Sequence, residues 1–153
     1  MANTGAKEHS GIEELFPDLE QNIAQFPVRE GEEPWTVDEV VEIVSALLEE
    51  QTRLEAELAA ADAELSELLR NSGDGSGDDQ ADYGSSALER EQELTFLNNT
   101  RDLLEQNKRA LARVSAGTFG RCESCSQPIA KARQEAFPRA TLCVECKQKE
   151  ERR

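Results

Sequence analysis

The feature that most constrains this chain is a pair of CxxC motifs, Cys122–Cys125 and Cys143–Cys146, separated by seventeen residues. Each motif brings two sulfurs close together, and two such motifs facing each other supply the tetrahedral sulfur cage that Zn²⁺ prefers. The motifs use all four cysteines of the chain. Because four thiolates leave no coordination position for a catalytic water, the spacing predicts one structural Zn²⁺ bound by Cys122, Cys125, Cys143 and Cys146.

Two other uses of paired cysteines have to be weighed against zinc. A redox dithiol normally begins a helix in a βαβ context, and the sequence shows no such pattern. Disulfides form in oxidising compartments, yet no signal peptide precedes the motifs. The zinc interpretation is therefore preferred to both.

Charge is distributed unevenly along the 153 residues, whose net charge is −15. Residues 1–116 carry 9 basic and 27 acidic side chains, whereas residues 117–153 carry 8 basic and 5 acidic ones. A chain this acidic is repelled by phosphate backbones, so direct sequence-specific DNA binding is not expected. No apolar run approaches the roughly 20 residues that span a bilayer, and we expect a cytoplasmic protein.

Two long amphipathic helices are predicted upstream of the cysteines. Thr36 and Glu39 form a capping box that begins the first, which is expected to end near Arg70 or Asn71. Ser86 and Glu89 form a second capping box, and Gly117 is the expected C-terminal stop. Heptad spacing in the first helix indicates a coiled-coil seam, made of Val37, Val40, Val44, Leu47, Gln51, Leu54, Leu58, Ala61, Leu65 and Leu68.

The predicted fold class is mainly α: a long antiparallel coiled-coil hairpin, then a small C4 zinc ribbon with a short C-terminal helix. Residues 1–34 are expected to be an acidic, largely disordered tail, because they are polar and rich in glycine and proline. The hairpin occupies residues 35–116 with an acidic tip loop at 72–85, and the zinc module occupies residues 117–153. An intermolecular coiled coil is the alternative to the hairpin. The expected core of the zinc module is Phe119, Ile129, Phe137 and Leu142.

This arrangement resembles the DksA/TraR zinc-finger family. The resemblance covers roughly residues 36–150, and the motifs that carry it are Gly117-Thr-Phe-Gly-x-Cys-x2-Cys, Ile129, Arg133, Glu135-Ala136, Pro138 and Cys143-x2-Cys146-Lys147. It extends upstream to Asp79-Gln-Ala-Asp82-Tyr-Gly84 and to Glu89-Arg90-Glu91.

The resemblance implies a transcription regulator that binds RNA polymerase. Its hairpin would enter the secondary channel and place the tip carboxylates of Asp79 and Asp82 near the catalytic centre, where they modulate promoter open complexes. The family's tip pattern Asp-x-x-Asp-x-Ala has Gly84 in place of its alanine, and glycine loosens the tip. Of the family's guanosine tetraphosphate positions, Lys147 matches, whereas Gln106 and Phe137 replace cations. Little nucleotide synergy is therefore expected.

Two other functions remain open. A transcript-cleavage factor would use the tip carboxylates to hold a second Mg²⁺ in the polymerase. A zinc-capped coiled-coil adaptor would not contact polymerase at all. The sequence shows no nucleophile–base pair, phosphate loop or open metal site, so we do not expect an enzyme.

Overall fold

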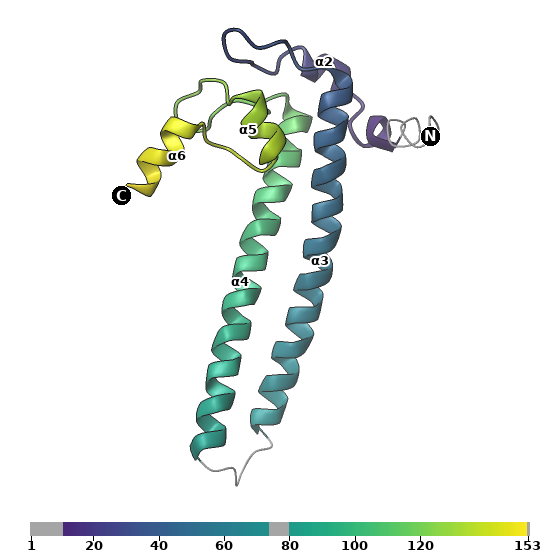
Figure 1. Cartoon of the computed structure of the whole chain (residues 1–153). Helices are drawn as coiled ribbons and strands as arrows, with labels where there is room; N and C mark the ends of the chain where they lie inside the picture. The colour runs from purple at the N-terminus through teal and green to yellow at the C-terminus, as the bar shows by residue number, and fades with distance from the viewer. Residues whose placement is uncertain (1–10, 74–79, 153) are drawn as a thin grey trace. The chain divides into compact units, whose positions relative to one another are not determined.

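The computed structural model describes residues 11–73 and 80–152, with every side chain except those of residues 72–73 and 80–86. Its elements are a helical turn at residues 11–15, then the helices α2 (Leu19–Ile23), α3 (Val37–Gly73), α4 (Gln80–Ala116), α5 (Lys131–Ala136) and α6 (Val144–Glu151) (Figure 1). No strand forms in these ranges, where one isolated bridge joins Arg121 and Pro128. The prediction of a mainly α chain is confirmed. None of the described helices has the length and apolar character needed to cross a membrane.

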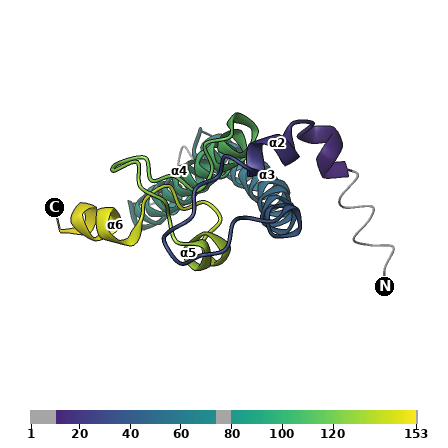
Figure 2. The same cartoon turned by 90° about the horizontal axis from the view of Figure 1, so that it is seen from above.

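The chain divides into two compact units, and both contain parts of the two long helices. The first unit comprises Met1–Glu50 and Gln106–Arg153, and the second comprises Gln51–Glu105. In each unit a stretch of α3 lies beside an antiparallel stretch of α4 (Figure 1), and the view along the helices shows α3 and α4 next to each other (Figure 2). The hairpin is therefore formed within one chain, as predicted.

The capping box predicted at the start of α3 is present. The backbone N–H of Glu39 donates to Thr36 Oγ1 at 3.2 Å, and the backbone N–H of Thr36 donates to Glu39 Oε1 at 3.0 Å. At the C-terminal end of α4, which lies at the same end of the helix pair, Gly117 follows the helix with a φ of +79°, which an L side chain rarely adopts. Both local signals place a helix end where the sequence predicts it.

The core of the first unit combines the N-terminal residues with α3, α4 and the start of the zinc module. The rings of Phe26 and Trp35 contact Phe119, with centroid distances of 5.4 and 5.8 Å. Asn107 of α4 is fully buried, and its Nδ2 donates to the carbonyl of Leu47 at 2.7 Å across the helix pair. The buried apolar side chains are Ile12, Phe16, Leu19, Ile23, Phe26, Trp35, Val40, Val41, Ile43, Val44, Leu47, Ala110, Val114 and Phe119.

Residues 11–34 differ from the predicted disordered tail. Ile12, Phe16, Leu19, Ile23 and Phe26 are all buried, although prolines and glycines surround them. Their spacing of four and three residues is the period of one helix face. Although the helical segments here are short, these five side chains together form an apolar face that packs against α3 and α4. The rest of the predicted tail, residues 1–10, lies outside the described residues.

The second unit has a thinner core. Its buried side chains are Leu54 and Ala61 of α3 with Leu97, Thr100 and Leu104 of α4. The Thr100 hydroxyl donates to the Phe96 carbonyl at 2.9 Å, so the polar group in this seam has a partner. The apolar side chains of Leu69, Leu88, Leu94 and Phe96 stay about half exposed.

The helix pair extends farther toward the turn than the capping signals predict. α4 begins at Gln80 instead of Ser86, and α3 ends at Gly73. The predicted loop at 72–85 is therefore too long. Residues 80–85 contain no proline, and extending an existing helix through Gly84 costs only about 1 kcal/mol. A capping box consequently marks a favourable start for α4 but does not prevent an earlier one.

Candidate metal centre

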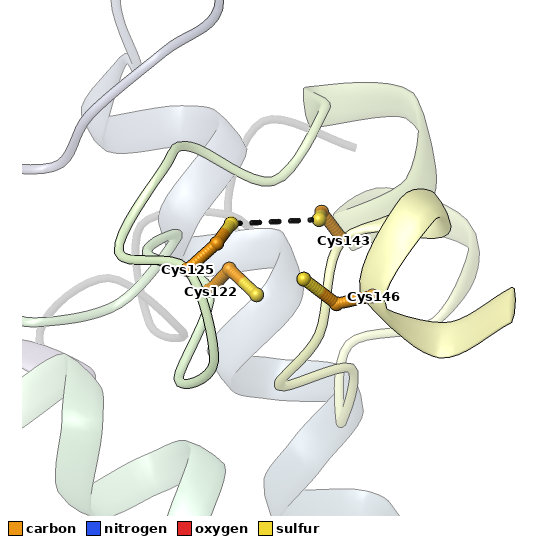
Figure 3. Close-up of side chains that lie close together, drawn as sticks. All are labelled: Cys122, Cys125, Cys143 and Cys146. Atoms are coloured by element: carbon orange, nitrogen blue, oxygen red, sulfur yellow. Dashed lines mark hydrogen bonds between the residues drawn. The ribbon is translucent and has the colours of Figure 1, made fainter. Parts of the chain in front are cut away.

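The four cysteines meet at one point of the first unit, although 23 residues separate the first from the last. Their Sγ atoms all lie within 4.8 Å of one another (Figure 3). The Sγ atoms of Cys125 and Cys143 are 3.8 Å apart. A tetrahedral site with Zn–S bonds of about 2.3 Å places its sulfurs about 3.8 Å apart. All four side chains are free thiols, not disulfides. The donor set and its spacing therefore fit one structural Zn²⁺, as predicted.

A tight turn shapes the first pair of ligands. The backbone N–H of Cys122 donates to the Gln127 carbonyl at 2.8 Å, and the N–H of Ser126 donates back to the Cys122 carbonyl at 3.0 Å. Ser126 has a φ of +65°, the left-handed conformation that lets the chain turn beyond Cys125. The N–H of Ile129 donates to Gly120 at 2.7 Å and closes the base of the turn.

A helix start shapes the second pair. Cys143 is the N-cap residue of α6, and Cys146 lies in the first turn of that helix. The N–H of Glu123 donates to the Thr141 carbonyl at 2.8 Å, which joins the two cysteine turns by their backbones. Arg133 Nε donates to the Leu142 carbonyl at 3.0 Å. These bonds hold the motifs face to face, and buried Ile129 packs with Cys122 and Cys143 beneath them.

The thiols of the site do not ionise equally easily, because their surroundings shift the pKa values of Cys122 and Cys146 in opposite directions. Burial opposes ionisation of Cys122, but hydrogen bonds from nearby backbone N–H groups outweigh it and lower its pKa to about 6. The side-chain hydrogen bond with Cys143 raises the pKa of Cys146 to about 12. Since zinc binds thiolates, loading the site must release protons from the remaining thiols.

Arg113, near the end of α4, is a residue of this site that sequence reasoning missed. Its buried guanidinium donates to the carbonyls of Thr118 and Arg121, next to the first ligand. Burial lowers the pKa of Arg113, and attraction to Glu123 and Cys122 offsets only part of this effect. The cation therefore lies where a tetrathiolate zinc site has negative charge. A lone arginine near a helix end carries no signal in the sequence that would single it out.

Beside the metal centre, α4, α5 and α6 border a groove of about 610 Å³. Lys147, Gln106 and Phe137, the positions discussed above for a nucleotide, all line it. Its further lining residues are Arg109, Arg133, Ala136, Pro138, Arg139, Ala140, Thr141, Leu142, Glu150 and Glu151. Three arginines that the sequence analysis did not assign to a site are therefore part of the same surface.

Phe137 does not belong to the core of the zinc module, where the sequence analysis placed it. Its side chain is 61% exposed, while Phe119 is 1% exposed and Ile129 fully buried. The Arg133 guanidinium lies 5.8 Å from the Phe137 ring centroid, within cation–π distance. The reason is that Phe137 directly follows α5 and lines the open groove, where its ring lies near the Arg133 guanidinium.

The acidic tip predicted at Asp79 and Asp82 is only partly described. Asp79 lies outside the described residues, and Asp82 belongs to α4, whose side chains are described from residue 87 onward. The structure therefore supplies no side-chain geometry for either carboxylate. Their predicted role remains a prediction.

Comparison with known proteins agrees with the geometry of the metal centre. Residues 117–152 match the prokaryotic dksA/traR C4-type zinc finger. General stress protein 16O of Bacillus subtilis is 31% identical over 110 residues, which cover 72% of this chain and 67% of that protein. The chain belongs to the DksA/TraR C4-type zinc-finger family.

Two relatives with DksA in their names support this membership. The RNA polymerase-binding transcription factor DksA of Caulobacter vibrioides is 43% identical over 75 residues, 49% of this chain and 53% of the relative. The chain thus spans about half the length of that DksA/TraR relative. The structure of transcription factor DksA2 from Pseudomonas aeruginosa superposes with a TM-score of 0.63 at 29% identity, covering 76% of this chain and 85% of that one.

Proposed function

We propose that this protein is a transcription regulator that binds bacterial RNA polymerase. The observation that carries the proposal is the joint occurrence of the C4 site and the α3/α4 pair in a chain that superposes on DksA2 with a TM-score of 0.63. A relative that is 43% identical over 75 residues is named for polymerase binding. The site of action would be the bacterial cytoplasm.

The charge of the second unit supports entry into a basic channel. Residues 51–105 contain 14 acidic and 4 basic side chains. Acidic surfaces accelerate association with basic partners and favour the correct orientation. We propose that the turn between α3 and α4 enters the secondary channel, where Asp79 and Asp82 act on the open complex. The chain itself would have no catalytic activity, because four thiolates fill the coordination positions of zinc.

The test is the lifetime of a promoter open complex with polymerase from the same organism. The protein is expected to shorten this lifetime on a ribosomal promoter, and an Asp79→Asn/Asp82→Asn variant is expected to bind polymerase without doing so. A matched control, Asp102→Asn/Glu105→Gln, removes the same charge elsewhere in the second unit and should act like wild type. Equal effects of the two double variants would show that only net charge matters. Transcript cleavage would favour the cleavage factor, and failure to bind polymerase would favour the adaptor.

We further propose that guanosine tetraphosphate adds little to this effect. Two cations of the groove already have partners: Arg133 donates to the Leu142 carbonyl, and Arg139 lies 3.5 Å from Glu50. The replaced positions, Gln106 and Phe137, line the same groove. Open-complex lifetimes with and without the nucleotide should therefore be similar. A Gln106→Lys/Phe137→Arg variant should gain a response, and a strong response of the wild type would refute this.

A further inference from the structure

The N-terminal residues 22–35, here called the clamp segment, contact the end of α4 as well as the zinc module. At its start, Asn22 Nδ2 donates to the Ser115 carbonyl at 3.0 Å, one of the last carbonyls of α4. In its middle, the Arg29 guanidinium lies 3.5 Å from Glu145, which stands between the two cysteines of the second pair. The segment thus links α4 to a ligand-bearing helix far away in sequence.

The first cysteine turn is fitted to the clamp segment as well. Gly120 has a φ of +86°, and a Cβ there would lie 3.4 Å from the Pro27 carbonyl oxygen and 3.6 Å from Trp35 Nε1. Phe119, the preceding residue, packs between Phe26 and Trp35 of the segment. A Cβ at position 120 would thus make ordinary van der Waals contact with the segment, which shows that the segment lies directly against the turn, while the positive φ is what favours glycine there.

Lys131, the first residue of α5, is the point where these contacts converge. Its Nζ donates to Glu39 Oε1 at 2.9 Å and to the Glu33 carbonyl at 3.1 Å, and it lies 5.0 Å from the Trp35 ring centroid. Its backbone N–H donates to Glu32 Oε2 at 2.9 Å. The Lys131 side chain is only 13% exposed. The carboxylate, the carbonyl and the ring compensate the partial burial of this cation, so removing them would leave a buried charge with fewer partners.

We propose that the clamp segment holds the zinc module on the α3/α4 pair of the first unit, with Lys131 as the positioning residue. α5 begins at Lys131 and carries Arg133, and Phe137 follows it directly, so the residue that seats α5 also sets one wall of the groove. Zinc would shape the cysteine turns, while Lys131 determines where they are held. Any consequence for polymerase binding rests on the proposed function above.

The experiment compares zinc-loaded full-length protein with Lys131→Met, which keeps the apolar stem and removes the charge. Lys149→Met, at an exposed lysine of α6, is the matched control. Glu32→Gln is a second clamp variant, because it weakens the acceptor of the Lys131 N–H and leaves the lysine intact. The readouts are hydrogen exchange of residues 22–35, the emission of Trp35, which is the only tryptophan, and bound zinc per chain.

We expect Lys131→Met to raise exchange in residues 22–35 by on the order of tenfold to a hundredfold, with Trp35 emission shifted to longer wavelength and zinc unchanged. Glu32→Gln should do the same more weakly, and Lys149→Met should not. Unchanged exchange and emission in Lys131→Met would overturn the proposal. Loss of zinc from that variant would overturn it too, because the contact would then be part of the metal site's own folding.

Polymerase affinity separates this inference from the proposed function. If the wild type binds polymerase, Lys131→Met should bind more weakly at unchanged zinc content, and equal binding would overturn the link to the groove. If the wild type does not bind, the proposed function fails. The exchange data would still decide whether residues 22–35 act as a clamp.

Discussion

Replacement of Phe119 by alanine tests the core that joins the N-terminal residues to the zinc module. The Phe119 ring is 1% exposed and contacts the rings of Phe26 and Trp35 at 5.4 and 5.8 Å. The variant removes a buried ring whose partners, Phe26 and Trp35, lie more than eighty residues earlier in the chain. These partners are held by their own elements, so they cannot move in to fill the space that the ring leaves. The variant therefore loses the transfer free energy of the ring and leaves a cavity.

The expected cost is large compared with the stability of a small domain. Buried Phe→Ala substitutions lower the free energy of unfolding by about 3–5 kcal/mol, and a domain has only about 5–15 kcal/mol in total. Each of the two ring contacts stabilises the fold by about 0.5–1.5 kcal/mol beyond the burial of its area. The cost of Phe119→Ala is therefore expected in the upper half of the range for buried Phe→Ala substitutions. We expect a loss of about 4–5 kcal/mol for the first unit.

Urea unfolding followed by Trp35 emission measures this loss, with zinc kept saturating. Phe137→Ala is the matched control, because it removes the same ring from a side chain that is 61% exposed. Its cost should stay within about 0.5 kcal/mol. Similar costs for the two variants would refute the argument, since they would mean that burial in this structure does not decide which phenylalanine stabilises the module.

Three further predictions concern the metal, a carboxylate and a glycine. Cys143→Ser should abolish zinc binding and unfold residues 118–150 while most α3 and α4 helicity survives; metal analysis and far-UV circular dichroism check this, and full occupancy would contradict it. Glu39 has a pKa lowered mainly by its side-chain hydrogen bond with Lys131, so its stabilising effect is present above the unfolded-state pKa of about 4.3 and is lost as pH falls through the lower folded value. The stability difference between wild type and Glu39→Gln should therefore be full at pH 7 and shrink below about pH 4; a difference that grows on acidification would contradict it. Gly120→Ala should lower the free energy of unfolding by about 1–2 kcal/mol, because alanine is strained at a φ of +86°; an unchanged urea midpoint would show that the turn relaxes.

The most reliable sequence predictions were those in which the chemistry is local. The four ligands follow from the donor atoms and their spacing, because a tetrathiolate site needs little beyond two facing turns. The capping box at Thr36 and Glu39 and the stop at Gly117 depend on residues within one helical turn of each other, so their sequence signals are complete. Heptad spacing likewise predicts that Leu47, Leu54 and Ala61 are buried.

Burial across long sequence separations was decided by the tertiary structure alone. Phe119 and Phe137 look alike in the sequence, yet Phe26 and Trp35 cover only the first of them. Ile12 and Phe16 lie in a polar stretch that local composition marks as disordered, but the end of the helix pair offers them an apolar surface. Lys131 acquires its role from Glu32 and Glu39, more than ninety residues earlier. The free energy of such contacts depends on partners brought together by the fold, and local sequence patterns carry no information about which partners those are.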